Sequence, residues 1–217
     1  MTNFSAARTA MVDCQVRPSD VTRYPIIAAL QDVPRELYVP TALKEVSYSG
    51  DQIELGNGRV LLDPRSFAKM LDALAVSPRD LVLDIGSGLG YSAAVLANMA
   101  EAVVAVEEIE DMATEAQDVL STQSAHNVVV KAGPLVEGAP EHGPYDVIIL
   151  EGGVETIPEA ISAQLKEGGR IGAIFVDGAI GQMKLGTKRG DRLAWRTIFD
   201  TVAPVLNGFQ VEKGFKL

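Results

Sequence analysis

Short apolar runs alternate with helical stretches along the chain from residue 81 onward. Five runs, each followed by Gly, Pro or acidic residues, are predicted strands: 81–85, 103–107, 128–132, 146–150 and 170–176. Helices are predicted between them over 92–99, 110–123 and 158–165, the last with Pro158 near its start and two glycines just past its end. This alternation predicts an α/β fold, a Rossmann-like parallel sheet with helices on both faces.

The segment that follows has the pattern of a β-hairpin. Residues 182–187 and 193–199 resemble strands, and the polar turn 188–191 separates them. Strands joined by a short turn pair antiparallel. We therefore expect a C-terminal antiparallel hairpin at an edge of the sheet, which makes the sheet mixed.

Residues 1–80 differ from the rest, because they are helical and loop-like and alternate only around 52–62. Phe67, Met70, Leu71 and Leu74 recur at helical spacing, which predicts one apolar stripe of a helix that packs on the sheet. We predict a single domain over 1–217, in which residues 1–80 form an N-terminal helical cap with a substrate loop and 81–217 form the core that binds a cofactor. Such a cap is placed to cover a ligand at the strand ends.

Composition and charge restrict the partners, the compartment and the metal sites that we expect. The 29 acidic residues outnumber the 19 basic ones, and the net charge of −10 disfavours nucleic acid as a partner. Arg8, Asp13 and Arg17 interrupt the start of the chain, and the sequence has no 18-residue apolar run, so we expect a cytoplasmic protein without a membrane partner. Cys14 is the only cysteine, and with two histidines we expect no metal site. The sequence leaves the oligomeric state open.

The densest signal is the stretch 81–92, an apolar strand that runs into Gly86, Gly88 and Gly90 and then into a helix. Glycine permits positive φ and close approach of a ligand, and the amides at the helix start offer hydrogen-bond donors. A dinucleotide fingerprint places its third glycine one residue later, where Tyr91 stands, which disfavours NAD. The alternative is that the glycines only turn the strand into the helix.

Two acidic residues accompany this loop. Asp84 precedes the first glycine, where a carboxylate suits an ammonium group better than a pyrophosphate. Glu107 ends the next predicted strand, 21 residues after Gly86 (107 − 86), and a carboxylate there accepts hydrogen bonds from both ribose hydroxyls. The alternative for Glu107 is an ordinary carboxylate in solvent at the end of the strand. For the neighbouring Glu108, a surface position without a role in binding is the expected interpretation. Together these features indicate a nucleoside with an appended amino acid, S-adenosylmethionine.

The chain resembles the protein-L-isoaspartate O-methyltransferases over nearly its whole length. The matching motifs in the N-terminal part are Met11-Val12, Gln15-Val16-Arg17, Val33-Pro34-Arg35-Glu36, Tyr38-Val39-Pro40, Ser47-Tyr48, Gly56-Asn57-Gly58 and Pro64. Those in the rest are 84–91, Val106-Glu107, Asn127-Val128, Pro144-Tyr145-Asp146, Ile157-Pro158 and 164–170. The resemblance implies a seven-stranded methyltransferase sheet, S-adenosylmethionine as cofactor with S-adenosylhomocysteine as product, and methylation of an isoaspartyl carboxylate in damaged protein.

Motif matching assigns the cofactor site to the strand ends. The residues it implies are Asp84, Ile85, Gly86, Ser87, Gly88, Gly90, Tyr91, Glu107, Glu108, Gly133, Pro134, Leu135 and Glu151.

The first departure from the family pattern lies between Gly58 and Pro64, where the family has Gln-Thr-Ile-Ser-Gln and this chain has Arg-Val-Leu-Leu-Asp. Leu62 stands at the position of the family's serine, and Val60 at that of its threonine, so the hydroxyl beside the reacting carboxylate is missing. Methyl transfer to an ionised carboxylate depends mainly on alignment and desolvation, and activity can survive this loss. Arg59 and Asp63 are either substrate contacts or, more commonly, a charged pair on a surface loop.

Two further departures follow the third and fourth strands of the core. The family's Gly-Asp-Gly, whose aspartate reaches the adenine amino group, is Gly133-Pro134-Leu135 here, so adenine is expected to be held by packing on Leu135 or by another acceptor. The loss of one hydrogen bond costs about 0.5 to 1.5 kcal/mol of affinity. Glu151 stands where the family has small neutral residues. It is a base, a partner for a cationic group, or a helix-terminus carboxylate satisfied by amides.

Three functional hypotheses remain from the sequence. The first is an isoaspartyl methyltransferase that uses S-adenosylmethionine. The second keeps the fold and cofactor but methylates a small-molecule acceptor, which Leu62 and Glu151 favour. The third is a non-catalytic cofactor-binding or regulatory protein, for which weak cofactor binding or none is expected.

Overall fold

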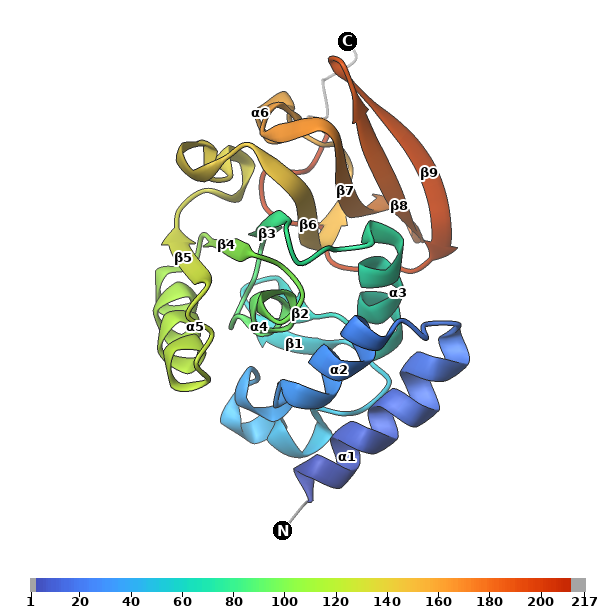
Figure 1. Cartoon of the computed structure of the whole chain (residues 1–217), viewed down its shortest axis with the longest axis vertical. Helices are drawn as coiled ribbons and strands as arrows, with labels where there is room; N and C mark the ends of the chain where they lie inside the picture. The colour runs from blue at the N-terminus through green and yellow to red at the C-terminus, as the bar shows by residue number, and fades with distance from the viewer. Residues whose placement is uncertain (1–2, 212–217) are drawn as a thin grey trace.

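Seven strands form one central sheet in the computed structural model, which describes residues 3–211 (Figure 1). Their order across the sheet is β5-β4-β3-β6-β7-β8-β9. Their bounds are β3 (Leu81–Ile85), β4 (Ala102–Glu107), β5 (Val128–Ala132), β6 (Tyr145–Val154), β7 (Leu165–Asp177), β8 (Ile180–Arg189) and β9 (Arg192–Asp200). The first five in chain order pair parallel, whereas β8 and β9 add antiparallel at the edge. The predicted mixed Rossmann-like sheet and its C-terminal hairpin are confirmed.

The core helices are α4 (Tyr91–Ala97), α5 (Glu110–Thr122) and α6 (Glu159–Ala163). The prediction of a helix over 158–165 is wrong at its end, because β7 already begins at Leu165. The Tyr145 N–H donates to the carbonyl of Gln164 at 2.8 Å, and Leu165 pairs with Tyr145 in the sheet. This pairing places Leu165 in a strand, three residues before Gly168, the first of the two glycines from which the helix end was predicted.

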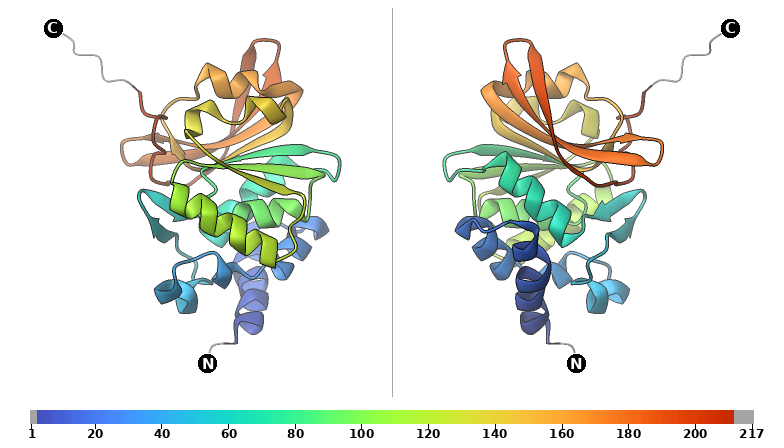
Figure 2. Two further views of the ribbon diagram at one scale, coloured as in Figure 1. Left: turned by 90° about the vertical axis from the view of Figure 1, so that its left-hand side faces the viewer. Right: turned by 90° about the vertical axis from the view of Figure 1, so that its right-hand side faces the viewer.

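The N-terminal part folds as helices, short turns and a small hairpin that lie on one face of the sheet. Its bounds are α1 (Phe4–Met11), η1 (Val12–Val16), η2 (Arg17–Ser19), α2 (Tyr24–Asp32), η3 (Arg35–Leu37), η4 (Thr41–Val46), β1 (Ile53–Gly56), β2 (Arg59–Leu61) and α3 (Pro64–Leu74). Figure 2 shows these elements together with α4 and α5 below the sheet, and α6 with the short turns η5 (Leu135–Glu137) and η6 (Pro140–His142) above it.

Two apolar clusters correspond to the two faces. The cluster on the cap side contains Val82, Ala105 and Ile149 with the buried residues of the cap, while Leu83, Val106 and Leu150 belong to the opposite cluster. Successive strand residues alternate between the clusters, as the pleat requires. The four residues of the predicted stripe on α3 are buried on the cap side, at 67, 70, 71 and 74, which confirms that prediction.

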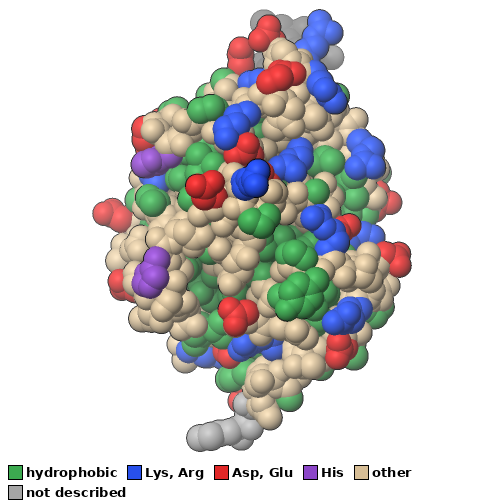
Figure 3. Space-filling model, in the orientation of Figure 1, with side chains coloured by type: hydrophobic (Ala, Val, Ile, Leu, Met, Phe, Trp, Pro, Cys, Tyr) green, Lys and Arg blue, Asp and Glu red, His purple; other side chains and the backbone are tan. Residues whose placement is uncertain are grey.

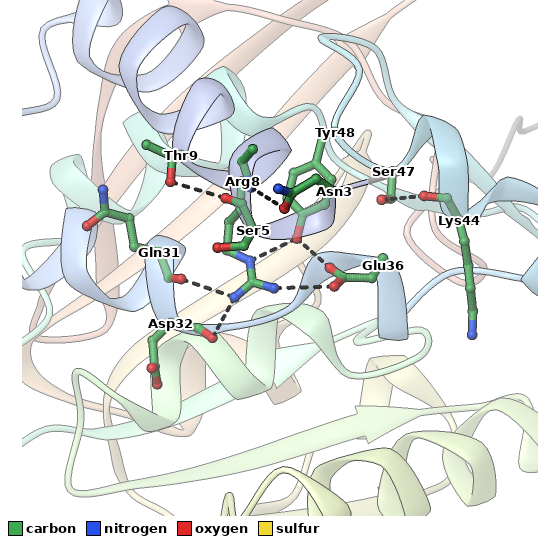
Figure 4. A network of polar contacts seen from close by, with 11 residues as sticks. Asn3, Ser5, Arg8, Thr9, Gln31, Asp32, Glu36, Lys44, Ser47 and Tyr48 are labelled. Atoms are coloured by element: carbon green, nitrogen blue, oxygen red, sulfur yellow. Dashed lines mark hydrogen bonds and ion pairs between the residues drawn. The ribbon is translucent and has the colours of Figure 1, made fainter. Parts of the chain in front are cut away.

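A polar network inside the cap ties its segments together (Figure 4). Arg8 on α1 donates from Nε to the Tyr48 hydroxyl at 2.9 Å and forms an ion pair with Glu36 at 3.3 Å. The Tyr48 hydroxyl in turn donates to Glu36, and Arg8 Nη1 donates to two carbonyls at the end of α2. Three segments far apart in the sequence are thereby fixed relative to one another.

The surface carries charges of both signs. On the face shown in Figure 3, Lys and Arg side chains are interspersed with Asp and Glu. Among the described residues, no helix is both long and apolar enough to cross a membrane.

Candidate active site

Three buried carboxyl groups lie side by side at the carboxyl ends of adjacent strands. Asp84 on β3 is the register partner of Ala105 on β4 and of Ile149 on β6. Glu107 follows Ala105 by two residues, and Glu151 follows Ile149 by two. Because strand side chains alternate, all three carboxyl groups project from the same face, the one that the cap covers. The exposed fractions of Asp84, Glu107 and Glu151 are 0%, 0% and 4%.

The glycine loop between β3 and α4 has the backbone conformation that its sequence predicts. Gly86, Gly88 and Gly90 have φ of 77°, 54° and 91°, a region that other residues adopt at a cost. A Cβ on Gly88 would lie 2.8 Å from a methyl carbon of Leu55 on β1, and one on Gly86 would lie 3.2 Å from a methyl carbon of Leu206. Apolar side chains therefore cover the loop.

An arginine from the hairpin of β1 and β2 forms an ion pair with Glu107. Arg59 on β2 donates from Nε to both carboxylate oxygens of Glu107, at 3.2 and 3.1 Å, and from Nη2 to Glu108 at 2.7 Å. The N–H groups of Gly88 and Ile109 donate to Glu107 as well, at 2.9 and 3.0 Å. Every acceptor oxygen of Glu107 is thus engaged by the chain itself.

The structure excludes three of the interpretations that the sequence left open for these side chains. Arg59 and Asp63 are not a charged pair on a surface loop: Arg59 is 2% exposed and bound to Glu107, and Asp63 caps α3 by accepting from the Ser66 N–H at 2.9 Å. Glu107 is not solvated. Glu108 is partly buried and also accepts from Asn207 at 3.1 Å, because Arg59 and the C-terminal segment close over it.

Asp84 and Glu151 form no ion pair with any residue in the range that the structure describes. Ser92 at the start of α4 donates from Oγ to Asp84 Oδ2 at 2.6 Å, whereas Asp84 Oδ1 and Glu151 Oε1 lack hydrogen-bond partners among residues 3–211. Burial raises the pKa of Asp84 to about 7, with a further contribution from the charge of Glu107. Burial likewise raises the pKa of Glu151 well above its usual value, and the charge of Asp84 adds to the rise.

The interpretation of Glu151 as a helix-terminus carboxylate is wrong, because the residue lies inside β6. The charge of Arg35 acts on Glu151 and opposes the rise in the pKa of Glu151. Arg35 is fully buried, and its guanidinium lies 4.9 Å from the centre of the Tyr91 ring. The hydroxyls of Tyr91 and Ser87 are buried and find no partner within the described range.

The loop that departs from the family pattern lies against this site. Leu62 is buried, and its carbonyl accepts from Arg35 Nη2 at 2.7 Å. Val60 on β2 is buried as well. Two apolar side chains thus occupy the positions where the resemblance places hydroxyl groups.

The segment after β5 contributes packing. The Gly133 N–H donates to the carbonyl of Glu107 at 3.0 Å, which places this turn beside the end of β4. Pro134 is exposed, whereas Leu135 is buried in the same cluster as Ile85 and Leu206. Leu135 would lie 3.7 Å from a Cβ on Gly86, so it is positioned to contact a ligand on the loop.

The residues present fit a nucleoside that carries an amino acid. Gly86 and Gly88 form a cradle that a Cβ would obstruct, Glu107 offers a buried carboxylate, and Asp84 and Glu151 hold unpartnered oxygens beside it. No group of three or more His, Cys, Asp or Glu side chains in the described part of the chain is arranged to hold a metal ion. No pattern in the sequence predicts the Arg59–Glu107 pair or the covering residues Leu55 and Leu206.

The chain is similar to known proteins along most of its length. A family model described as protein-L-isoaspartate(D-aspartate) O-methyltransferase matches residues 7–203. A protein-L-isoaspartate O-methyltransferase of Trichlorobacter lovleyi is 37% identical over 171 residues, which cover 79% of this chain and 79% of that protein. A second relative of that name, numbered 2, from Marinobacter nauticus is 37% identical over 169 residues, 78% of this chain and 77% of its own.

Solved structures agree with these matches. A protein-L-isoaspartate O-methyltransferase superposes with a TM-score of 0.82 at 25% identity, over 93% of this chain and 66% of the other. A Plasmodium falciparum structure of that name, in complex with S-adenosyl-L-homocysteine, superposes with a TM-score of 0.80 at 18% identity, over 95% of this chain and 99% of the other. The second similarity shows the shared fold.

Proposed function

The chain belongs to the protein-L-isoaspartate O-methyltransferase family, and on that premise we propose that it methylates isoaspartyl carboxylates of damaged proteins with S-adenosylmethionine as methyl donor. The observation that carries the proposal is the buried arrangement of the glycine loop with Asp84, Glu107 and Glu151 at three adjacent strand ends. Neither a small-molecule acceptor nor a non-catalytic role is favoured by the relatives described above, which are named protein-L-isoaspartate O-methyltransferase.

The cofactor would be held at the carboxyl ends of the strands. Glu107 would accept the ribose hydroxyls, Leu135 would pack on the adenine, and Asp84 would face the methionine part. The Ser87 hydroxyl, which is buried without a described partner, and the adjoining amides offer further donors and acceptors. Ile85, Gly90, Gly133 and Pro134 would shape the walls of the crevice, while Glu108 would stay with Arg59.

The hairpin of β1 and β2 has to move before this site can be filled. Leu55 lies on Gly88, Arg59 holds Glu107, and Leu206 from the C-terminal segment lies on Gly86. The hairpin turn Gly56-Asn57-Gly58 has positive φ at all three residues and is exposed. We place the opening of the site in a shift of this hairpin, with residues 1–80 acting as cap and substrate loop.

Methyl transfer needs little acid or base chemistry from the protein. When bound, S-adenosylmethionine supplies a methyl group activated by its positively charged sulfur. An isoaspartyl carboxylate is already ionised at neutral pH, so this chain contributes alignment and exclusion of water. Val60 and Leu62 provide an apolar wall there instead of hydroxyl donors, and Asp63, as the cap of α3, fixes the end of the loop.

We also place the protein in the cytoplasm, since its single cysteine forms no intrachain disulfide.

Calorimetric titration with S-adenosylhomocysteine tests the proposed cofactor site. We expect binding by the wild-type chain and a loss of at least tenfold in affinity for Glu107→Ala, because the ribose hydroxyls lose their acceptor. Glu115→Gln, an exposed position on α5, is the matched control and should bind as the wild type does. Absence of binding by the folded wild-type chain would contradict the proposal.

A further inference from the structure

Glu151 is a carboxyl group that the family pattern does not explain, and it lies beside another one. Asp84 and Glu151 project from neighbouring strands toward the same face, and both are almost completely buried. Asp84 Oδ1 and Glu151 Oε1 each lack a hydrogen-bond partner in the part of the chain that the structure describes. Buried carboxyl oxygens normally have partners, because the loss of hydration is otherwise uncompensated.

Neither carboxyl group of this pair forms an ion pair among residues 3–211. Ser92 from α4 donates one hydrogen bond to Asp84 Oδ2 and carries no charge. Glu107 from β4 is paired with Arg59 from the hairpin. The charge of Arg35 from η3 acts on Glu151, but its Nε and Nη2 donate to the carbonyls of Ser47 and Leu62, both at 2.7 Å, and its buried Nη1 has no partner in the described part of the chain.

Tyr91 from α4 packs beside Arg35, and burial raises its pKa above the usual value, so it is a neutral phenol at pH 7. The charge of Asp63, at the start of α3, also acts on Arg35. Burial of two neighbouring carboxyl groups without an ion-pair partner in the described residues disfavours ionisation of both, so we expect them to retain a proton between them at neutral pH. The raised pKa values of Asp84 and Glu151 agree with this.

We propose that Glu151 joins Asp84 in holding the ammonium group of an α-amino acid, the methionine part of the cofactor, and that the pair releases its shared proton when the ammonium binds. The inference rests on the proposed function, since that function supplies the ligand. An ammonium group has three N–H donors and one positive charge, which match the two unpartnered oxygens and the missing cation. The proton passes from the carboxyl pair to solvent, and no covalent bond of the ligand changes.

Glu151 is then a specificity residue of this chain. It selects nucleosides that carry an amino acid over those that lack one, because only the former bring a cation to the pair. It would also offset affinity lost at Pro134, where the adenine has no carboxylate partner.

Two ligands distinguish the binding of the ammonium group by Glu151 from a general contribution of Glu151 to the stability of the site. S-adenosylhomocysteine carries the amino acid, whereas 5′-methylthioadenosine has the same nucleoside and sulfur without the ammonium. We expect Glu151→Gln to weaken S-adenosylhomocysteine at least tenfold and to leave 5′-methylthioadenosine within twofold of the wild type. Titration at pH 7 in phosphate and in Tris, which differ in ionisation enthalpy, should show proton release by the wild type with S-adenosylhomocysteine and less by the variant.

The outcomes are distinct. Equal weakening of both ligands, or of neither, overturns the inference while the proposed function stands. Weaker binding of an acceptor peptide with unchanged S-adenosylhomocysteine affinity overturns it too, and assigns Glu151 to the acceptor. Failure of both ligands to bind the folded wild-type chain overturns the proposed function together with the inference. Glu115→Gln is again the control, and thermal unfolding establishes that each variant is folded.

Discussion

Arg59 Nε lies 3.2 and 3.1 Å from the two carboxylate oxygens of Glu107, across 48 residues of sequence. Both side chains are buried, and the same guanidinium also pairs with Glu108. A ribose would need the oxygens that Arg59 now holds. In the proposed cofactor site this ion pair would compete with the ribose, and it also holds the hairpin over the glycine loop.

Replacing Arg59 by the family's glutamine should have opposite effects on stability and affinity. Arg59→Gln leaves Glu107 without its cation, so we expect a loss of about 3 kcal/mol in the free energy of unfolding of the ligand-free chain. The same change frees Glu107 for the ribose, and the Kd of S-adenosylhomocysteine should fall about tenfold, the equivalent of about 1.4 kcal/mol. Chemical denaturation and calorimetry measure the two effects.

The matched control for Arg59 is Arg65→Gln, because Arg65 is exposed on α3. It should change neither quantity. A Kd that rises in Arg59→Gln would instead mean that Arg59 contacts the cofactor, and the competition would be refuted.

Restoring the hydroxyls of the loop should improve methyl transfer. The double variant Val60→Thr with Leu62→Ser returns donors beside the acceptor carboxylate, and one hydrogen bond formed in the transition state is equivalent to about a tenfold gain in kcat/KM. The change truncates Leu62, which is buried, so stability should fall by about 3 kcal/mol. Rates of methyl transfer to an isoaspartyl peptide provide the measurement.

Val60→Thr with Leu62→Ala removes a similar volume without restoring the serine hydroxyl, and it should show less gain than the serine variant. Equal rates in the two variants would show that the hydroxyl at position 62 contributes nothing in this chain.

The stability of the ligand-free chain should decrease as the pH rises. The pKa of Asp84 rises from 3.8 to about 7 on folding, and that of Glu151 rises well above 4.5. The folded state therefore binds more protons than the unfolded chain above about pH 4, and this stabilisation is lost as the pH rises through the folded-state values. Each group contributes a slope of at most about 1.4 kcal/mol per pH unit.

Urea unfolding of the wild type and Glu151→Gln between pH 5 and pH 8 measures this slope. The variant should show a shallower decrease, because one of the two titrating groups is gone. Identical slopes would mean that Glu151 does not titrate in the folded state.

The polar network of Arg8, Glu36 and Tyr48 in the cap should stabilise the fold independently of the active site. Tyr48→Phe removes the hydroxyl that links Arg8 and Glu36, and we expect a loss of about 1 to 3 kcal/mol in the free energy of unfolding, since both partners are charged. Tyr24→Phe is the control, because Tyr24 is 80% exposed on α2. Equal effects of the two changes would refute the role of the network.

The sequence predicted what depends on local pattern. The strands 81–85 and 128–132 match β3 and β5 to the residue, because each is an apolar run with a clear stop. The glycine loop and Glu107 were likewise identifiable, since their spacing follows from a strand, a turn and a helix of fixed size. Leu165 shows the limit of such patterns: its assignment to β7 depends on pairing with Tyr145, twenty residues away in the chain.

The side-chain environments of the site were not predictable in the same way. Whether Arg59 lies on a surface loop or in the core depends on how the hairpin docks against β4, and no local pattern encodes that. The same holds for Glu151, whose burial depends on the cap and on the C-terminal segment, where the Leu206 N–H donates to the Gly153 carbonyl at 2.8 Å. For Arg59 and Glu151, whose surroundings come from segments distant in the sequence, the structure therefore changes the interpretation that the sequence suggested.

We expect this chain to methylate isoaspartyl residues without the loop hydroxyls of its family. The transfer of a labelled methyl group from S-adenosylmethionine to a peptide that contains isoaspartate, beside the same peptide with ordinary aspartate, measures this activity directly. A base-labile methyl ester should form on the isoaspartyl peptide alone. Bound cofactor with no transfer to that peptide would refute the proposed activity.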